Sequence, residues 1–562
     1  MRPKKVLNIH APDEHLQEHL SAVLHISPLV AQVLINRNIR TFEEAKQFLS
    51  VGEDAFFDPF LFRDMDSAVR RIKTACTNGE KVLIFGDYDV DGITSLTLLK
   101  STLKKMGLDV VHYIPHRIKE GYGLGDSIVA LAQEKGISLL ITVDCGTSSF
   151  DEVLALQEAG IDVIITDHHE PSQEVLPPAL CCINPKVKNS GYPFRELAGV
   201  GVVLKLCQAL TGTGCLDDLD VAALGTIADV VPLVSENRVI ARLGLARLTS
   251  TMRPGLRALM TQSRLHEKKM NAGYVSFILG PRINASGRVD TGEVSLELLM
   301  SQDSREADKL AQTVEGFNRQ RQKIEKKIFE EAQALINKEV NFKDQKVIVV
   351  AGDDWHQGVL GVVASKLADR FYRPTILISR KDGSCKGSGR SIKNFHLFDA
   401  LMECSGCLET FGGHAHAVGL VILHENIDDF RSKINQWAHQ KLMIEDLLPC
   451  MDVDMETSLG IFSLDVCRQL QQLEPFGAAN PEPLFFTKNV SVKGVAQSLG
   501  RETLKMWVSD GVTTLPAIGF GMSGLKESIM ASGSFDMVFT PRLDTWNENE
   551  SIILQIEEIF LR

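Results

Sequence analysis

Residues 82–92, Val-Leu-Ile-Phe-Gly-Asp-Tyr-Asp-Val-Asp-Gly, decide the fold of the middle of this chain. The unbroken apolar run is typical of a parallel strand that is buried on both faces. Asp87, Asp89 and Asp91 follow it, directly before a helix that we expect over residues 93–106. Ligands bind at this carboxyl edge of open α/β sheets. Three neighbouring carboxylates repel one another, and Mg²⁺ or Mn²⁺, which prefer oxygen ligands, would relieve that repulsion. The alternative is a polar turn in which one aspartate caps the helix.

Strands and helices alternate on both sides of this stretch, from about residue 70 to residue 235. This alternation predicts a parallel sheet. A predicted strand over 139–143 leads into Asp144, and another over 163–166 leads into the Asp-His-His sequence at 167–169. Because parallel strands end at the same edge of a sheet, we expect these side chains to meet the three aspartates.

A further carboxylate, Asp229, lies in the otherwise apolar stretch 224–233. A charged carboxylate among Ile, Val and Leu is unfavourable unless it is paired or bound to a metal. The alternative is a helix cap or a buried aspartate whose hydrogen bonds are satisfied.

The rest of the chain adds three regions of different character. Apolar residues recur every three or four positions before residue 70 and again over 294–340, which predicts helices. A smaller α/β region follows, and short strands separated by turns near the end predict a barrel or sandwich. The predicted fold is therefore a multidomain α/β protein with a C-terminal β-barrel, divided at residues 1–70, 71–293, 294–340, 341–445 and 446–562.

Bulk composition excludes some classes of protein. A chain of 562 residues is too long for one core, and its content of 44% hydrophobic and 23% charged residues is ordinary for a globular protein. We see no apolar run long enough to span a bilayer and expect a cytoplasmic location. Eleven cysteines in apolar segments predict reduced core thiols. The net charge of −12 argues against coating of nucleic acid through bulk charge but allows a local basic groove.

An ordered series of motifs spans nearly the whole chain. The chain resembles the DHH phosphoesterase superfamily and, within it, the RecJ family of single-stranded-DNA-specific exonucleases. The stretches that carry the resemblance are Asp87–Gly92, Asp144–Gly146, Asp167–His169, Gly280–Arg288, Trp355–Gly361, Gly387–Ser391, Phe411–Gly419 and Leu473–Gly477.

The resemblance implies a metal-dependent enzyme that hydrolyses single-stranded DNA in the 5′-to-3′ direction to 5′-mononucleotides. It implies two Mn²⁺ or Mg²⁺ ions and a role in recombination, mismatch repair and base-excision repair. A DHH catalytic domain over 71–293, a DHHA1 domain over 341–445 and an OB-like domain over 446–562 would act on the strand. A single-strand-binding protein and a helicase are the expected partners.

Two-metal hydrolysis of a phosphodiester needs a set of acidic and imidazole ligands. Asp144 ends a central strand and is our candidate for bridging the two ions. Because adjacent side chains on an extended segment point to opposite sides, we expect His168 to bind metal and His169 to act on the scissile phosphate. The predicted metal ligands are Asp87, Asp89, Asp91, Asp144, His168 and Asp229.

A terminal 5′-phosphate calls for guanidinium and hydroxyl donors. We place Ser388 and Arg390 in a glycine-flanked loop and Arg282 in the Asn-Ala-Ser-Gly loop. For any single arginine the alternative is an ion pair with a surface acid, and for Tyr122 or Trp355 it is buried packing. The predicted contacts to phosphate or strand are Arg117, Tyr122, Arg282, Asn284, Arg288, His356, Ser388, Arg390 and His414.

Two other functions remain open from the sequence. One is a DHH-family phosphodiesterase for oligonucleotides or cyclic dinucleotides, although the long helical connector and the C-terminal β domain argue against a small substrate. The other is an inactive single-strand-binding scaffold, against which the intact set of clustered carboxylates argues.

Overall fold

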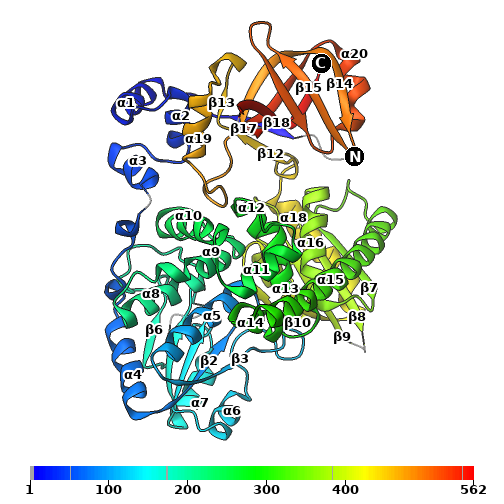
Figure 1. Cartoon of the computed structure of the whole chain (residues 1–562). Helices are drawn as coiled ribbons and strands as arrows, with labels where there is room; N and C mark the ends of the chain where they lie inside the picture. The colour runs from blue at the N-terminus through cyan, green and yellow to red at the C-terminus, as the bar shows by residue number, and fades with distance from the viewer. Residues whose placement is uncertain (1–4, 51, 172–174, 382–383, 501, 547–548) are drawn as a thin grey trace. The chain divides into compact units, whose positions relative to one another are not determined.

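The computed structural model divides into two compact units (Figure 1). It describes residues 5–50, 52–171, 175–381, 384–500, 502–546 and 549–562. The predicted N-terminal region therefore includes residues 1–4, which lie outside the described part. The first unit comprises Met1–Val6, Asp58–Asp229 and Gly244–Pro449, and the second comprises Leu7–Phe57, Val230–Leu243 and Cys450–Arg562.

A five-stranded parallel sheet forms the first half of the first unit. Its strands are β2 (Lys81–Gly86), β3 (Asp109–Tyr113), β4 (Leu139–Val143), β5 (Asp162–Thr166) and β6 (Cys181–Ile183), in the order β3-β2-β4-β5-β6. Every pairing is parallel, as the sequence predicts. The order reverses direction between β2 and β4. Such a switch point opens a crevice at the carboxyl ends of the two strands.

Helices cover both faces of this sheet (Figure 1). Leu83 and Phe85 of β2 pack in one core with residues of α6 and α7, while α5 packs with α8 and α9. The predicted helix over 93–106 is α5, which begins three residues earlier. The helices are α4 (Met65–Asn78), α5 (Val90–Lys105), α6 (Ile128–Glu134), α7 (Phe150–Glu158), α8 (Gly199–Thr211) and α9 (Leu219–Ala228).

A run of helices connects the sheet to a second lobe of the same unit. The predicted connector is mainly α15, a helix of 36 residues. The stretch 280–288, which we predicted as a loop, is instead helical because it continues the turns of the preceding segment. The elements are α11 (Pro254–Gln262), α12 (Ala272–Tyr274), the π-helix η4 (Val275–Leu279), α13 (Gly280–Val289), α14 (Glu293–Met300) and α15 (Ser304–Glu339). The helix before them, α10 (Ser235–Thr249), begins in the second unit and ends in the first.

The second lobe contains a mixed five-stranded sheet in the order β10-β11-β9-β8-β7. Ser388 and Arg390 lie on β9, a strand paired on both sides, so the loop that we predicted for them is wrong. The elements are β7 (Ile348–Asp353), α16 (Gln357–Phe371), β8 (Thr375–Lys381), β9 (Ser384–Arg390), α17 (Leu397–Glu403), β10 (Leu408–Gly413), β11 (Ala417–Leu423) and α18 (Ile427–Lys441).

The second unit combines the N-terminal helices with a C-terminal barrel. The strands follow the order β13-β14-β15-β16-β18-β17, and pairing of β14 with β17 closes the barrel. Among the short strands that we predicted for this region, β14 is instead a single long strand of 15 residues with an irregular register. The strands are β1 (Val6–Ile9), β12 (Cys450–Val453), β13 (Met455–Glu456), β14 (Phe485–Leu499), β15 (Thr503–Ser509), β16 (Thr514–Gly519), β17 (Phe535–Trp546) and β18 (Asn549–Leu561).

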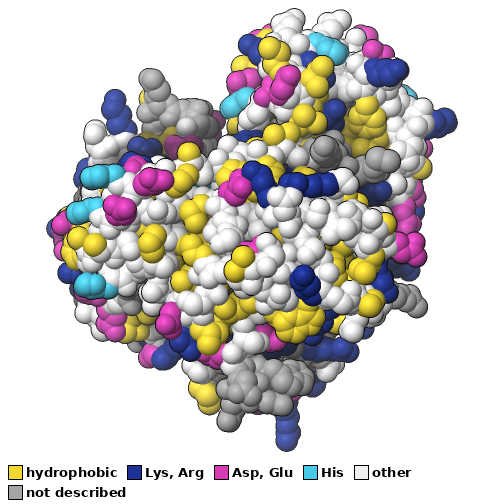
Figure 2. All heavy atoms as spheres, turned by 90° about the horizontal axis from the view of Figure 1, so that it is seen from above, with side chains coloured by type: hydrophobic (Ala, Val, Ile, Leu, Met, Phe, Trp, Pro, Cys, Tyr) yellow, Lys and Arg dark blue, Asp and Glu magenta, His cyan; other side chains and the backbone are white. Residues whose placement is uncertain are grey.

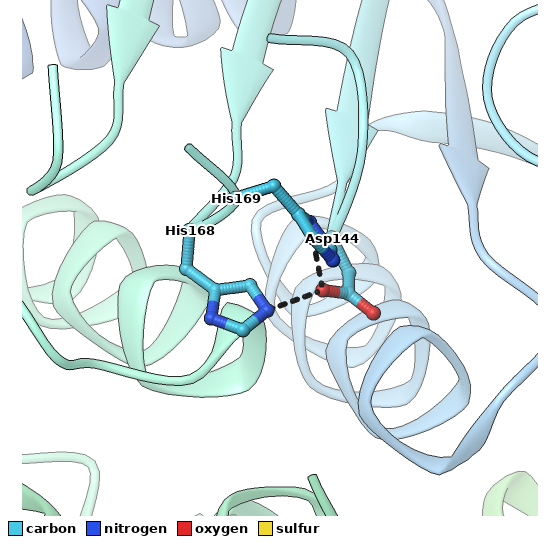
Figure 3. Close-up of side chains that lie close together, drawn as sticks. All are labelled: Asp144, His168 and His169. Carbon is cyan, nitrogen blue, oxygen red and sulfur yellow. Dashed lines mark ion pairs between the residues drawn. The ribbon is translucent and has the colours of Figure 1, made fainter. Parts of the chain in front are cut away.

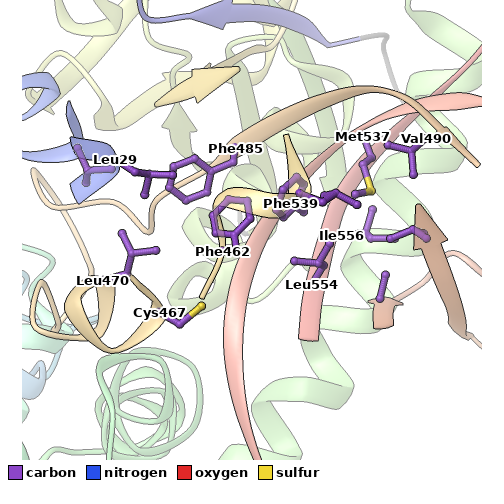
Figure 4. Packing of buried hydrophobic residues seen from close by; sticks show 14 of the residues in the cluster. Leu29, Phe462, Cys467, Leu470, Phe485, Val490, Met537, Phe539, Leu554 and Ile556 are labelled. Atoms are coloured by element: carbon purple, nitrogen blue, oxygen red, sulfur yellow. The ribbon is translucent and has the colours of Figure 1, made fainter. Parts of the chain in front are cut away.

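One hydrophobic core joins both ends of the chain in this unit (Figure 4). Leu29 of α2 packs in the same cluster as Phe462, Phe485 and Phe539. Thr41 and Glu44 form a capping box at the start of α3. The helices are α1 (Glu14–Leu24), α2 (Pro28–Asn36), α3 (Phe42–Leu49), α19 (Leu464–Gln471) and α20 (Lys526–Ser532).

The distribution of surface charge, the state of the cysteine thiols and the apolar content of the helices agree with what we predicted from composition. Figure 2 shows one face on which basic, acidic and apolar side chains are interspersed, with several Lys and Arg side chains next to one another near the middle of the view. All eleven cysteines are free thiols and most are buried. Among the described helices, none alone is both long and apolar enough to cross a membrane, although the bent pair α1 and α2 meets these criteria together.

Candidate active site

The ends of three parallel strands bring the predicted acidic and imidazole side chains together. Asp87 follows β2, Asp144 follows β4 and His168 follows β5. The Nε2 atom of His168 lies 3.2 Å from Oδ1 of Asp144 (Figure 3). It also lies 3.6 Å from Oδ2 of Asp229 and 3.8 Å from Oδ2 of Asp91. All six predicted metal ligands therefore lie in one cluster, which we call the acidic cluster.

Three overlapping groups in this cluster have the geometry of metal sites, since their ligand atoms lie within 4.8 Å of one another. Asp144 and His168 each belong to two of the groups, which agrees with the predicted bridging role of Asp144. The groups are Asp87, Asp89 and Asp144; Asp91, His168 and Asp229; and Asp144, His168 and His169.

Local backbone geometry separates the roles of the aspartates that follow β2. Asp89 Oδ1 accepts hydrogen bonds from the N–H groups of Asp91 (2.9 Å) and Gly92 (3.1 Å), so it caps α5, as the alternative interpretation held for one aspartate. Asp91 accepts from the N–H groups of Gly199 (2.6 Å) and Val200 (2.8 Å) at the start of α8. The positive end of a helix dipole favours a carboxylate there. These contacts stabilise Asp91 within the buried site.

Burial and mutual repulsion shift the acidity of the carboxyl groups. Burial, with the charge of Asp89, raises the pKa of Asp87 to about 8 and that of Asp91 to about 7. Burial, with the charges of Asp91 and Asp89, holds the pKa values of Asp144 and Asp229 well above their usual range. Buried carboxylates at this density need a cation to remain ionised at neutral pH.

The donor set fits a divalent metal ion. Within the described residues, Oδ1 of Asp87, Oδ1 of Asp144 and Nε2 of His168 are buried without a hydrogen-bond partner. Carboxylate oxygens suit Mg²⁺ and Mn²⁺, and imidazole suits transition metals. Asp144 also has φ = 61°, an uncommon conformation for a residue other than glycine. Such conformations concentrate at functional sites.

The two adjacent histidines do not point to opposite sides as predicted. Their ring centroids lie 4.5 Å apart, and both rings face Asp144, with Nδ1 of His169 4.0 Å from Asp144 Oδ1 (Figure 3). The chain turns at the end of β5, so the alternation of an extended strand does not apply. Burial and the charge of His169 lower the pKa of His168 to about 3, which keeps it neutral and able to bind metal.

Asp167 is a residue whose role the sequence analysis missed. Its Oδ1 accepts from Nδ1–H of His169 (2.8 Å) and from the N–H groups of His168 and His169, and its Oδ2 accepts from the N–H of Thr147 (3.0 Å). Burial lowers the pKa of His169, but the hydrogen bond and charge of Asp167 outweigh it and raise the pKa to about 9. The signal available in the sequence was the position of Asp167 directly before the histidine pair.

Tyr122, predicted to contact the strand, lies beside His169. Its hydroxyl donates to the backbone oxygen of Asp144 (3.1 Å) and lies 2.9 Å from Nδ1 of His169. The side chain is half-exposed. It therefore orients the histidine and still presents its ring to solvent.

Three of the predicted arginines form a second cluster, which we call the arginine cluster: Arg117, Arg288 and Arg390. Burial and repulsion by Arg117, Arg321 and Arg390 lower the pKa of Arg288 to about 9. Burial and Arg117 also lower the pKa of Arg390. Within the described residues the three guanidinium groups form no ion pair, so an anion would fit among them.

The start of α16 lies against this cluster. A Cβ atom on Gly361 would lie 2.7 Å from Nη2 of Arg390 and 3.1 Å from Oγ of Ser388, and one on Gly358 would lie 2.5 Å from the backbone oxygen of Arg288. Only glycine permits these approaches. His356 precedes the helix, and its buried Nδ1 lacks a partner among the described residues.

The arginine cluster and the acidic cluster are neighbours. The guanidinium of Arg117 lies 4.1 Å from the ring centroid of Tyr88, the residue between Asp87 and Asp89. Burial, with the charges of His416, Arg390 and His169, lowers the pKa of His414, so His414 lies near Arg390 of the arginine cluster and near His169 beside the acidic cluster. The first unit therefore places a cationic cluster and an anionic cluster side by side.

Other predicted strand contacts have different surroundings. Arg282 forms an ion pair with Glu315 (2.8 Å), which is the alternative that we weighed for such arginines. Asn284 is half-buried on α13. Trp355 is buried, and its Nε1–H donates to Glu331, so the packing interpretation holds for it.

Family models match three parts of the chain: the DHH family N-terminal domain over residues 81–228, the DHHA1 domain over 344–440 and the RecJ OB domain over 453–558. The single-stranded-DNA-specific exonuclease RecJ of Bacillus subtilis is 41% identical over 553 residues, covering 98% of this chain and 70% of that protein. The chain belongs to the RecJ family. This result confirms the resemblance drawn from the motifs. The Haemophilus influenzae RecJ exonuclease is 33% identical over 95% of this chain and 96% of its own length.

Solved RecJ structures agree in fold and in metal content. RecJ of Thermus thermophilus in complex with Mn²⁺ superposes with a TM-score of 0.83 at 27% identity, covering all of this chain and 80% of that one. A second structure of that protein, in complex with Mg²⁺, has a TM-score of 0.76 at 25% identity. Together with the acidic cluster, these structures confirm the prediction of Mn²⁺ or Mg²⁺ as cofactor.

Proposed function

We propose that this protein is an exonuclease that degrades single-stranded DNA in the 5′-to-3′ direction and releases 5′-mononucleotides. The observation that carries the proposal is the contact of the two clusters through Arg117 and Tyr88. A terminal phosphate among the arginines and the next phosphate at the acidic cluster would place one nucleotide between them. Cleavage would then remove one nucleotide at a time.

The arginine cluster would set the position of the strand. Arg117, Arg288 and Arg390 offer charge-assisted donors to a 5′-phosphate, and Ser388 adds a hydroxyl. The glycines of α16 allow the backbone to approach the same group. A strand without the terminal phosphate loses these contacts, so it should bind more weakly.

The acidic cluster would carry the chemistry. Two Mn²⁺ or Mg²⁺ ions, when bound, activate the attacking water and neutralise charge on the phosphate. Asp87, Asp89 and Asp144 would hold one ion, and Asp91, His168 and Asp229 the other. Asp144 would be the shared ligand, a role supported by the 3.2 Å between its Oδ1 and Nε2 of His168.

His169 would act as proton donor to the leaving 3′-oxygen. Its Nδ1–H is held by Asp167, which leaves Nε2 free to face the substrate. With a pKa of about 9 the imidazole is protonated at neutral pH. It therefore also stabilises negative charge that develops on the scissile phosphate.

The wider role follows from the family. We propose that the protein acts on DNA in the cytoplasm during recombination and during mismatch and base-excision repair, with a single-strand-binding protein and a helicase as partners. The C-terminal barrel would provide a binding site for the strand that is separate from the catalytic residues, since OB-type barrels bind single strands.

The test is digestion of a single strand labelled at either end, with Mn²⁺ or with a chelator. We expect mononucleotides from the 5′ end only, and only with metal. The Asp144→Ala variant should release none, whereas Asp109→Asn, at the opposite end of an edge strand, should match the wild type. Cleavage of a dinucleotide without degradation of the long strand would instead support the small-substrate phosphodiesterase. Strand binding without any turnover would support the inactive scaffold.

A further inference from the structure

An exposed aromatic side chain, Phe277, lies on the π-helix η4, outside both clusters. Phe277 is 82% exposed, although it belongs to a regular helical segment of the first unit. Its helix neighbours Val275 and Leu279 are fully buried. The exposure is therefore set by the backbone, which anchors one side of the segment and turns Phe277 outward.

The backbone around Phe277 is π-helical. A π-helix inserts an extra residue into a turn, shifts the side chains that follow, and occurs most often at functional sites. Here five π-helical residues separate α12 from α13. The side chain of Asn271 fixes the start of the segment by accepting from the N–H of Tyr274 (2.8 Å).

This segment adjoins the acidic cluster. A Cβ atom on Gly280, three residues after Phe277, would lie 3.3 Å from Cβ of Ala228 and 4.0 Å from Cγ2 of Val90. Val90 stands between two of the cluster aspartates, and Ala228 directly precedes Asp229. Phe277 is thus about one helical turn from the residues that surround the metal ligands.

The charges near Phe277 favour a nucleic acid over an apolar partner. Nζ of Lys268 lies 5.4 Å from the ring centroid of Tyr274, which is one turn before Phe277. Lys268 and Lys269 are exposed, and neither forms an ion pair within the described residues. Of the neighbouring acids, Glu267 lies 3.4 Å from Nε2 of His266, and Glu315 is paired with Arg282 and Arg319. Aromatic faces next to free lysines are typical of surfaces that bind single strands.

We propose that Phe277 stacks on a base of the substrate strand on the 3′ side of the scissile phosphate, with Lys268 beside the strand's backbone. The inference rests on the proposed function. If the 5′ end lies in the arginine cluster, every nucleotide that reaches the surface beyond the acidic cluster lies 3′ of the cleavage point. Stacking there tolerates any base and strengthens binding of the strand without touching the reacting atoms.

The first test compares Phe277→Leu, which keeps an apolar side chain, with Phe277→Trp, which keeps an aromatic face. Affinity for a fluorescent single strand is measured in chelator, and KM and kcat are measured with Mn²⁺. We expect Phe277→Leu to weaken affinity and raise KM about five- to tenfold with kcat unchanged, since loss of one stacked base has this order of effect. Phe277→Trp should bind at least as well as the wild type.

The control is Phe342→Leu. Phe342 is 41% exposed and stacks on Phe371 in the second lobe, before the first strand of that sheet. It should leave both affinity and KM unchanged. Equal loss in the Phe277 and Phe342 variants, or no loss in Phe277→Leu, would overturn the inference.

The second test uses strands with a single abasic position moved along the sequence from the 5′ end. For the wild type we expect one position at which the missing base weakens affinity, and for Phe277→Leu no added loss at that position. A profile that is identical in both proteins would overturn the inference. Because binding is measured without metal, a wild type that shows this profile but releases no mononucleotides would contradict the proposed activity alone.

Discussion

The acidic cluster and the arginine cluster both bury side chains of like charge, which is negative in the first cluster and positive in the second. In the acidic cluster, burial and the repulsion between neighbouring negative charges both raise the pKa values of Asp87 and Asp144. In the arginine cluster, burial and like charges lower the pKa of Arg288. Each cluster is unfavourable alone, and the charges of one do not neutralise those of the other by direct ion pairs among the described residues. The comparison indicates that metal ions complete one pocket and a phosphate completes the other.

Removal of the bridging carboxylate should have the largest effect. We expect Asp144→Asn to lower kcat at least about 10³-fold, because activation of water and charge neutralisation both depend on the metal ligands. The measurement is the rate of mononucleotide release at saturating Mn²⁺. Activity within tenfold of the wild type would show that the acidic cluster is not the metal site, and Asp109→Asn is the matched control.

Removal of one arginine should abolish discrimination between strand ends. We expect Arg390→Ala to lower kcat/KM on 5′-phosphorylated strands about 10- to 100-fold, in line with the loss of charge-assisted hydrogen bonds, and to change 5′-hydroxyl strands little. Arg319→Ala, which breaks an exposed pair with Glu315, serves as control. An equal loss on both kinds of end would mean that Arg390 does not bind the terminal phosphate.

Asp167→Asn should shift the pH dependence of the reaction. In the wild type the proton on His169 is lost as the pH rises through about 9, so the rate should fall above that pH. Without the carboxylate the imidazole loses its proton at lower pH, and the alkaline limb of the kcat profile should move toward neutrality. An unchanged limb with a lower plateau would show that His169 is not the titrating group.

The smallest expected effect concerns stability without metal. The pKa of Asp87 is about 8 in the folded chain and near 4 when unfolded, so the folded state binds more protons between these values. Stability of the metal-free protein should therefore fall as the pH rises from 5 to 8. We expect Asp87→Asn to raise the Tm in chelator and to reduce the rise in Tm caused by Mn²⁺. Thermal denaturation at several pH values tests this, and a lower Tm for Asp87→Asn in chelator would contradict it.

Much of the acidic cluster was predictable because parallel strands end at one edge. Strands 139–143 and 163–166 were placed correctly, and the residues after them meet as expected. The orientation of His169 was not predictable, since the turn after β5 replaces the alternation of an extended strand. Asp167 was missed for the same reason, because its role depends on hydrogen bonds across that turn.

The arginine cluster was harder to predict. Its members come from a loop, a helix and a strand that are far apart in the sequence, and no periodicity relates Arg117 to Arg390. Only the family resemblance brought these three arginines together. It also grouped Arg282 with them, but in the structure Arg282 forms an ion pair with Glu315. In the second unit, the shared core of Leu29 and Phe485 likewise depends on contacts between the two ends of the chain.

The most direct test of the central claim is a crystal structure with Mn²⁺ and a 5′-phosphorylated dinucleotide whose internal linkage resists hydrolysis. The account predicts the terminal phosphate among Arg117, Arg288 and Arg390, the internal phosphate at the acidic cluster, and anomalous peaks of two ions there. A terminal phosphate bound elsewhere, with the arginine cluster empty, would contradict it.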